Sequence, residues 1–476
     1  MQTATALASS PHAGRSKAVL TVSLLAGFAV LIDQNMITVT LPTIQNALRL
    51  TDPQDAWAAA GYTLALALTL VLGGRLGDDY GRRRVLLISL TLFVVTTLCC
   101  GLAPDGTWLI IFRICAGCGA GLVSPQIVGL IQQVFSGRDR GRAYGFYSAI
   151  VSFSAVIGPL CGGAIISSLG ASRGWHVAFW PSSLVGLIAL AFAYRLLPRD
   201  EVDGGHRRLD LPGAALLGLC TFSIMLPVTE AGGNGGTPPW WLIGVGAVAL
   251  MLFYAWEKRL GRRGRHPLVR LKLLARRSYS VGAMTIVFFF AGYPGVLMLV
   301  QFSLQRGLHY TALEAAANTM VFGIGSSVAA IAGGRLAHRV GRQLVLAGCL
   351  AVIVGTGLIA VLLIIGAAPL LVGPFLLAGL GSGLIMAPNQ TLTMAEIPAA
   401  QGSTAGGVYQ TSMRLGQSVG VPFALTVYAA GLREWHGDVL TASAVGLIGS
   451  AALVGIALVV RVVDIAWPDH RETQAA

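Results

Sequence analysis

Apolar stretches long enough to cross a membrane follow one another along almost the whole chain. A transmembrane helix needs about 20 apolar residues, because without water each backbone polar group must be paired within its own segment. We therefore expect an all-α membrane protein. By this length the chain holds fourteen candidate spans: residues 19–42, 54–76, 85–103, 107–131, 143–168, 175–197, 212–229, 239–258, 280–303, 314–336, 344–366, 369–395, 404–430 and 440–466. Twelve or thirteen spans are the alternatives if 212–229 or 369–395 is not a span.

Composition excludes a soluble fold. Only 11% of the 476 residues are charged, 55% are apolar, and the mean hydropathy is +0.72. A soluble domain carries roughly 25% charged residues. The 61 glycines suit close helix packing in a membrane. The first apolar run continues to Leu41 without a small-residue cleavage site, so we expect a span there rather than a signal peptide.

The basic residues indicate an orientation. A net charge of +13 would by itself suggest nucleic-acid binding. Of the 33 Lys and Arg residues, however, 27 flank the spans on the side of the N-terminus and four flank them on the other side. Because positive loops stay in the cytoplasm, we expect both termini there and no nucleic-acid partner. A bias towards Ala, Gly and Arg suggests a bacterium with a GC-rich genome, and hence the inner (plasma) membrane.

A short basic phrase occurs twice, as GGRLGDDYGRRRVLL at 73–87 and as GGRLAHRVGRQLVLA at 333–347. Eight of the fifteen aligned positions are identical, and each copy lies between the second and third span of a set of six. We therefore predict two six-helix bundles, at 1–200 and 266–476, joined by a two-helix hairpin at 201–265. Parallel repeats of this kind are a building plan of secondary transporters.

Six motifs resemble the major facilitator superfamily. Three of them resemble motifs of the whole superfamily: the loop GGRLGDDYGRRR, the fourth-span stretch LIIFRICAGCGAG at 109–121 and the fifth-span antiporter stretch GFYSAIVSFSAVIGPLCGG at 145–163. The other three resemble its fourteen-span drug:proton antiporters: LIDQNMITVTLP at 31–42, LDLPG at 209–213 and GVYQTSMRLGQSVGV at 407–421. The chain departs from the usual motifs at Asn35 and Thr38, at Asp79, at Ala116 and at Ser154.

The resemblance implies a major-facilitator fold of two six-helix bundles with two extra transmembrane helices. It also implies export of small amphipathic or cationic compounds, such as drugs and secondary metabolites, in exchange for protons by alternating access. The expected partners are the substrate, protons and the lipid bilayer, and we expect a monomer without enzyme activity or cofactor. One alternative is an ion-coupled transporter of a single endogenous metabolite or nutrient. Another is a membrane sensor on the same scaffold, which the lack of a long soluble segment disfavours.

Asp33 is the one acidic residue that the candidate spans place far from a span end. A charge near the bilayer centre costs about 2.5–3.5 kcal/mol on insertion scales, so it usually lines a pathway or pairs with another charge. We predict that Asp33 binds protons or a cationic substrate and that Arg113, also within a span, couples its protonation to a change of shape. The alternatives are a structural ion pair between the two, or hydrogen bonds from Arg113 to backbone carbonyls.

Further polar groups within the spans are candidates for lining the cavity. They are Gln34 and Asn35 beside Asp33, Arg414 in the thirteenth span, and Asn389 and Gln390 in the twelfth. For Asn389 and Gln390 the alternative is a helix kink at the neighbouring proline.

The resemblance implies that the first basic loop latches the two halves together on the cytoplasmic side. The residues concerned are Gly74, Gly77, Asp78, Gly81, Arg82 and Arg83. Asp78 can accept hydrogen bonds from a helix N-terminus or pair with the arginines. His338 replaces this aspartate in the second copy, so we expect that copy to lack the latch. The alternative is that both loops only anchor the topology.

Small residues follow one face of the fifth span, at Gly145, Gly158, Gly162 and Gly163, with Pro159 among them. Small residues let helix backbones approach closely, and proline can bend a helix. The resemblance implies a tight seam that moves as a unit, whereas the alternative is ordinary packing.

The seven cysteines all fall in apolar segments, and CAGC at 115–118 has no nearby His or acidic residue. We therefore expect no metal site. Without a phosphate-binding loop in the sequence, an ion gradient is the expected energy source.

Overall fold

The computed structural model describes residues 11–199, 210–231, 239–263, 268–269, 271–310 and 312–467. The predicted linker boundaries, at 200–201 and 265–266, lie outside these residues. Regular structure in the described ranges is helical: α1 (Pro11–Leu48), α2 (Asp52–Tyr80), α3 (Arg82–Cys100), α4 (Gly106–Val134), α5 (Gly137–Val177), α6 (Trp180–Leu196), α7 (Leu211–Ala231), α8 (Trp241–Arg262), α9 (Leu271–Leu274), α10 (Arg277–Phe302), the π-helical turn η1 (Ser303–Gly307), α11 (Ala312–Ile364), η2 (Ala368–Leu371), α12 (Val372–Thr393), η3 (Ala399–Gln401), α13 (Gly402–Glu434) and α14 (Val439–Ala466).

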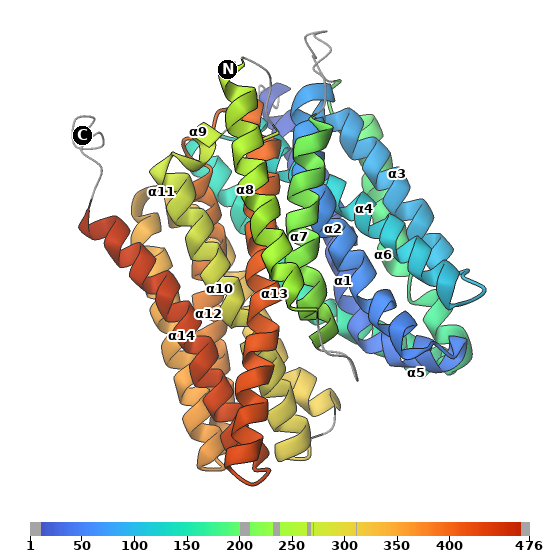
Figure 1. Ribbon diagram of the computed structural model, residues 1–476, viewed down its shortest axis with the longest axis vertical. Coiled ribbons are helices and arrows are strands. Elements are labelled where there is room, and N and C mark those ends of the chain that lie inside the picture. Colours follow the sequence, from blue (N-terminus) through green and yellow to red (C-terminus); the bar gives the residue numbers. More distant parts are fainter. Residues whose placement is uncertain are drawn as a thin grey trace, which may run out of the picture.

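The helices form two groups with a hairpin at their border (Figure 1). We call α1–α6 the N-half, α10–α14 the C-half and α7–α8 the linker hairpin. Helix α7 packs against α8, against α2 of the N-half and against α13 of the C-half. The hairpin therefore covers the line along which α2 meets α13.

Eleven helices in the described part of the chain are long and apolar enough to cross a membrane, and Trp180–Leu196 and Pro212–Pro227 are shorter apolar helices. The spans expected at 314–336 and 344–366 are joined in one 53-residue helix, α11. Its backbone leaves the helical conformation at Val340, with φ −131° and ψ 26°. This point lies in the second basic phrase, which therefore forms a kink in α11 rather than an open loop.

Local sequence explains where several helices begin. The Asp105 carboxylate accepts hydrogen bonds from the backbone N–H groups of Thr107 and Trp108, at 2.8 and 3.0 Å, and so caps α4. Asp438 caps α14 through the N–H of Leu440 in the same way. Between α2 and α3 the chain turns at Gly81, where φ is 98°. Glycine adopts this conformation without strain, so a single residue suffices to separate the two helices.

The two halves share a core at one end only, which we call the Asp78 end. One cluster of buried apolar side chains there joins Val71 and Ile131 of the N-half to Tyr279 and Ala405 of the C-half. At the opposite end, which we call the far end, the N-half and the C-half have separate apolar cores. Figure 1 shows the same relationship, because the helices of the two halves lie close together towards the top of the picture and diverge below.

Candidate functional site

Asp33 and Arg113 form an ion pair inside the N-half. The distance from Arg113 Nη1 to Asp33 Oδ2 is 2.8 Å, and each side chain is only 1% exposed. The hydroxyl of Ser182, on α6, donates to Asp33 Oδ1 at 3.2 Å. Asp33 therefore links α1 to α4 and α6, and the ion pair that the sequence left as an alternative is present. Its part in coupling stays a prediction.

An aromatic ring and two glycines fix the position of Arg113. Its guanidinium carbon lies 4.3 Å from the ring centroid of Tyr62 on α2. A Cβ atom at Gly117 or Gly121 would come within 2.3 Å of a backbone oxygen of α2. Only glycine lets α4 approach α2 this closely, and the approach brings Tyr62 over the guanidinium group.

Residues beside Asp33 connect it to two other helices. Gln34 Oε1 accepts a hydrogen bond of 3.1 Å from Arg414 Nη2, on α13 of the C-half. Asn35 donates to the carbonyl of Leu31 at 2.7 Å and to the hydroxyl of Ser154 on α5 at 3.5 Å. Of these predicted cavity-lining residues, Gln34 and Arg414 are thus brought together across the two halves.

The fifth-span glycines lie against two helices. A Cβ atom at Gly158 would lie 2.7 Å from Cβ of Asn35, and one at Gly162 would lie 2.8 Å from Cγ of Met36, both on α1. At Gly163 the nearest contact would be an ordinary 3.9 Å, to Val39. Gly145 instead packs on α11 of the C-half, where a Cβ atom at this position would lie 2.9 Å from the carbonyl oxygen of Ala330. Pro159 lies in the same helix and lines a cavity described below.

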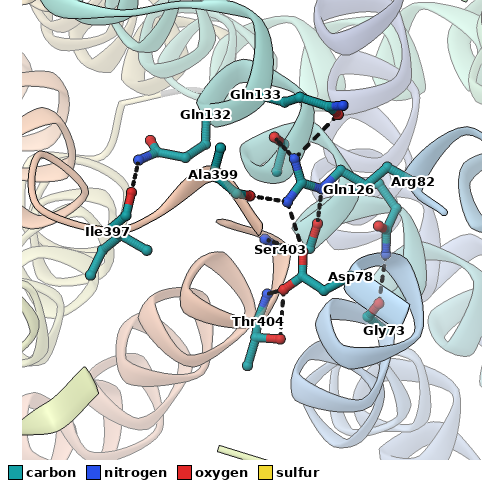
Figure 2. Close-up of polar contacts among 11 residues, drawn as sticks. Gly73, Asp78, Arg82, Gln126, Gln132, Gln133, Ile397, Ala399, Ser403 and Thr404 are labelled. Carbon is teal, nitrogen blue, oxygen red and sulfur yellow. Dashed lines mark hydrogen bonds and ion pairs between the residues drawn. The ribbon is translucent and has the colours of Figure 1, made fainter. Parts of the chain in front are cut away.

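Asp78 joins α2 to the start of α13 (Figure 2). Its Oδ1 accepts from the backbone N–H of Ser403 at 3.2 Å, and its Oδ2 accepts from the N–H and the hydroxyl of Thr404 at 2.8 and 2.7 Å. The N–H groups of a helix's first turn have no partner within the helix and carry partial positive charge. A carboxylate in this position satisfies two of them.

Arg82 strengthens this contact from the N-half side (Figure 2). It pairs with Asp78 at 2.8 Å and donates to the Ser403 hydroxyl at 2.9 Å, to the Gly129 carbonyl at 2.6 Å and to the Ala399 carbonyl. Arg82 thus contacts groups from both halves at once. We call the contacts of Asp78 and Arg82 with residues 399–404 the latch.

The other predicted latch residues shape the surroundings of these two side chains. A Cβ atom at Gly74 would lie 2.4 Å from the carbonyl oxygen of Ser403, and one at Gly77 would lie 1.8 Å from Oε1 of Gln126. Arg83 points elsewhere and donates to the carbonyl of Tyr194 at 2.7 Å, within the N-half. This hydrogen bond ties the end of α6 to the start of α3.

The C-half holds a charged cluster that the sequence did not indicate. Asp464 pairs with Arg277 at 3.3 Å, with Arg342 at 3.7 Å and with Arg461 at 3.3 Å. Arg461 also donates to Asn389, which is fully buried and contacts the Tyr409 hydroxyl at 3.1 Å. Arg461, which the count of basic residues placed among those that flank the spans, is 2% exposed instead. Asp464 and Glu257, which lie near the ends of their candidate spans, are also buried, at 5% and 1% exposed.

The predicted C-half polar residues lie mostly inside the bundle. Asn389 contacts Gly282, Tyr409 and Arg461, which come from α10, α13 and α14. Gln390 is 5% exposed. Its predicted contact with a cavity stays a prediction, whereas Asn389 is held by neighbours from three helices.

Two cavities lie between the halves, beyond the packed Asp78 end. One of about 620 Å³ is lined by Ser152, Pro159 and Ser167 of α5 and by residues of α1, α10 and α11, among them Tyr293 and Gln301. The other, of about 300 Å³, lies between α2 and α13 and includes Arg414. Both cavities lie beyond the point where the two halves pack closely. On the Asp78 side of the larger cavity, Gly141 of α5 packs against Gly334 of α11. On the Asp78 side of the smaller cavity, Gly407 of α13 packs against Leu70 of α2.

Comparison with known proteins agrees with this architecture. The family model of the Major Facilitator Superfamily matches residues 23–421. The chain belongs to this superfamily. The solved structure of the proton:xylose symporter XylE superposes with a TM-score of 0.66 at 17% sequence identity, covering 93% of this chain and 94% of XylE. This major facilitator protein is therefore a multi-pass, all-helical membrane transporter of small molecules and not an enzyme.

Two relatives of this major facilitator protein from Streptomyces cover most of its length. The probable actinorhodin transporter of Streptomyces coelicolor is 31% identical over 427 residues, which cover 88% of this chain and 73% of the relative. The puromycin resistance protein pur8 of Streptomyces alboniger is 29% identical over 477 residues, covering 96% and 92%. The resemblance to the superfamily, inferred from the motifs, is thereby confirmed.

Proposed function

We propose that this protein exports small amphipathic compounds, such as drugs or secondary metabolites, in exchange for protons by alternating access. The observation that carries the proposal is the asymmetry of the interface. The latch and a shared core close the Asp78 end, while cavities open between the halves towards the far end. If the Asp78 end faces the cytoplasm, this state is closed to the cytoplasm and open to the outside. An exporter would release its substrate to the outside from this state. The names of the two relatives support export of such compounds.

We propose further that the chain crosses the bacterial plasma membrane fourteen times as a monomer, with both termini in the cytoplasm. Eleven long helices, two shorter apolar helices and the division of α11 at Val340 are compatible with this number. The basic residues around the latch support the cytoplasmic position of the Asp78 end. Asn35, where the chain departs from the fourteen-span motif, packs against Gly158 and donates to Ser154 at 3.5 Å, both on α5.

For coupling, we propose that a proton binds Asp33 and weakens its ion pair with Arg113. The paired carboxylate holds α4 and α6 to α1, so neutralising it loosens three helices of the N-half together. The next residue, Gln34, contacts Arg414 of the C-half at 3.1 Å. A change at Asp33 can therefore reach the C-half through one turn of α1. Coupling requires that the proton and the substrate each prefer a different state.

The test uses purified protein in proteoliposomes energised by a pH step, with efflux of a fluorescent amphipathic compound and proton movement recorded together. Asp33→Asn imitates the protonated form permanently. It should insert normally and abolish proton-driven efflux while still allowing exchange down a substrate gradient. Asp139→Asn is the matched control, because this carboxylate is exposed and pairs with nearby Arg142 at 3.6 Å. Wild-type pumping and proton release in the Asp33 variant would show that the proton binds elsewhere.

A further inference from the structure

Arg414 differs from the other buried arginines of the described chain. Arg75, Arg82, Arg113 and Arg461 each pair with a carboxylate, at 2.7, 2.8, 2.8 and 3.3 Å. Arg414 is 8% exposed. Its guanidinium group donates to two neutral amide oxygens, Gln417 Oε1 and Gln34 Oε1, both at 3.1 Å, and no ion pair with a described carboxylate is formed. A buried cation without a counter-charge is costly, so the site favours a negative group supplied by a ligand.

Arg414 occupies one end of an apolar cavity. The lining residues of α13 begin with Arg414 and Gln417, nearest the Asp78 end, and continue through Val421, Pro422 and Leu425 towards the far end. Ala59, Ala60, Thr63 and Leu64 of α2 and Met225 of α7 complete the wall. The volume of about 300 Å³ suits a small aromatic compound. The cavity therefore offers one positive group at its inner end and apolar contacts along the rest.

Neither of the two cavities described above, of about 620 and 300 Å³, is lined by a carboxylate of the described chain. The carboxylates Asp78 and Asp79 line a separate cavity at the Asp78 end. The smaller cavity has Arg414 as its one charged lining residue, and the larger one is lined by apolar residues with hydroxyl and amide groups. The buried carboxylate of the N-half, Asp33, is held by Arg113 and Ser182. A cationic compound would meet no opposite charge in either cavity and would be repelled by Arg414 in the smaller one.

We propose that the cavity at Arg414 binds amphipathic organic anions, with the carboxylate, sulfonate or phenolate of the ligand at Arg414 and its apolar body along α2 and α13. An anion there competes with Gln34 for the guanidinium group. Binding thus breaks a hydrogen bond that joins α1 to α13 across the halves. The inference narrows the substrate class, and its transport part rests on the proposed function.

The experiment compares two dyes that share one ring system in protein reconstituted into nanodiscs. Anilinonaphthalene sulfonate carries the anion, N-phenyl naphthylamine lacks it, and empty nanodiscs give the lipid background. Arg414→Gln should weaken sulfonate binding about 10- to 100-fold, as expected for loss of a charge-assisted contact. It should leave the neutral dye nearly unchanged, and Arg414→Lys should fall between. Arg433→Gln removes an exposed charge from the same helix and should change neither dye.

Three results would overturn the proposal. They are equal sulfonate affinity in wild type and Arg414→Gln, an equal loss of both dyes in that variant, and tighter binding of the cation ethidium than of the sulfonate dye by wild type. If Arg414→Gln does not fold, Ala60→Trp serves instead. It fills the cavity and leaves Arg414 in place, so both dyes should be excluded, and unchanged sulfonate binding would again contradict the proposal.

Failure of the proposed function gives a different result. In proteoliposomes a pH step should drive export of the sulfonate dye by wild type but not by Arg414→Gln. If wild type binds the dye through Arg414 and no compound moves with the pH step, proton-coupled export is wrong and the anion site stands. If a pH step drives export of neutral and cationic compounds only, the anion site is wrong and the proposed function stands.

Discussion

Asp78 of α2 and Thr404 of α13 are joined by two hydrogen bonds, although 326 residues separate them in the sequence. One Asp78 oxygen accepts both the backbone N–H and the hydroxyl of Thr404, at 2.8 and 2.7 Å. The other oxygen accepts from Arg82 and from the N–H of Ser403. A single carboxylate thus connects the N-half to the first turn of a C-half helix, at the end where the halves share a core.

We expect Asp78→Asn to favour the state that is open at the Asp78 end. The amide keeps the shape but loses the charge, and hydrogen bonds to a charged group contribute about 1.5–3 kcal/mol. Loss of one such contact shifts a two-state population about ten- to hundredfold. Double electron–electron resonance between spin labels at the exposed positions Arg84 and Ala400 should therefore detect longer distances in the variant than in the wild type.

Asp79→Asn is the control for this measurement. Asp79 forms its ion pair with Arg75 of the same helix, at 2.7 Å, so its loss should change the distance distribution much less. If the label distances and the transport rate of the Asp78 variant equal those of wild type, the loop anchors topology and does not latch the halves.

The sequence indicates most of the membrane helices, and it marks the phrase that contains Asp78 and Arg82, because both signals are local. Spanning length is a property of one segment, and Asp78, Gly81 and Arg82 lie together in one phrase. Contacts between distant segments could not be predicted. Gln34 and Arg414 are 380 residues apart, and no periodicity in an apolar span indicates which face meets the other half.

Arg461 shows a second limit of the sequence. Its position near the end of the last span resembles that of a residue flanking the membrane. In the fold, Asn389 and Asp464 surround it, and only 2% of it is exposed. A one-dimensional count of basic residues cannot distinguish a charge in water from one paired inside a bundle.

We expect Gly158→Ala to disrupt the packing of α1 on α5. The new methyl group would lie 2.7 Å from Asn35 Cβ and 3.1 Å from the backbone nitrogen of Met36, and backbone cannot move aside easily. Overpacking of this kind costs about 1–3 kcal/mol. The melting temperature in detergent and the transport rate should both fall.

Gly163→Ala is the matched control for the seam, five residues along the same helix. Its methyl group would make an ordinary 3.9 Å contact with Val39, so stability and transport should be kept. Equal melting temperatures for the two variants would contradict a seam that depends on close approach at Gly158.

We expect Arg113→Met to be more damaging than the double variant Arg113→Met with Asp33→Asn. The single change leaves the Asp33 charge buried without its partner, which costs about 3–5 kcal/mol. The double change removes both charges. Thermal unfolding in detergent, followed by a dye that reacts with the newly exposed buried thiols Cys100, Cys220 and Cys349, measures the order. A double variant that unfolds below the single one would show that the two charges are not coupled.

The fourteen-span topology predicts the sides of the membrane for three positions outside the described residues. Reporter fusions at Gly205 and Gly264 should be cytoplasmic, and a fusion at Gly233 should be external, because the stretch 259–277 is rich in basic residues. An external reporter at Gly264 would exclude the arrangement of six, two and six spans.

Glu257, near the end of α8, attaches the linker hairpin to the segment that leads into the C-half. Its two carboxylate oxygens accept from the backbone N–H groups of Leu268 and Val269, at 3.2 and 3.3 Å, and only 1% of the residue is exposed. Glu257→Ala leaves both N–H groups without this acceptor, at a cost of about 1–3 kcal/mol for each one left buried and unpaired. The segment should then separate from α8 more often than in wild type.

Trypsin measures that separation, because Arg276 follows the segment and is exposed. Cleavage after Arg276 should be faster in Glu257→Ala than in wild type. In Glu257→Gln it should be intermediate, since the amide keeps one acceptor oxygen but places an N–H₂ group against the second backbone donor. Lys258→Ala is the control, because this neighbouring side chain is exposed and its loss leaves the carboxylate in place. If cleavage is as slow in the alanine variant as in wild type, the apolar contacts of Leu268 and Val269 hold the segment, and the buried carboxylate of Glu257 needs another explanation.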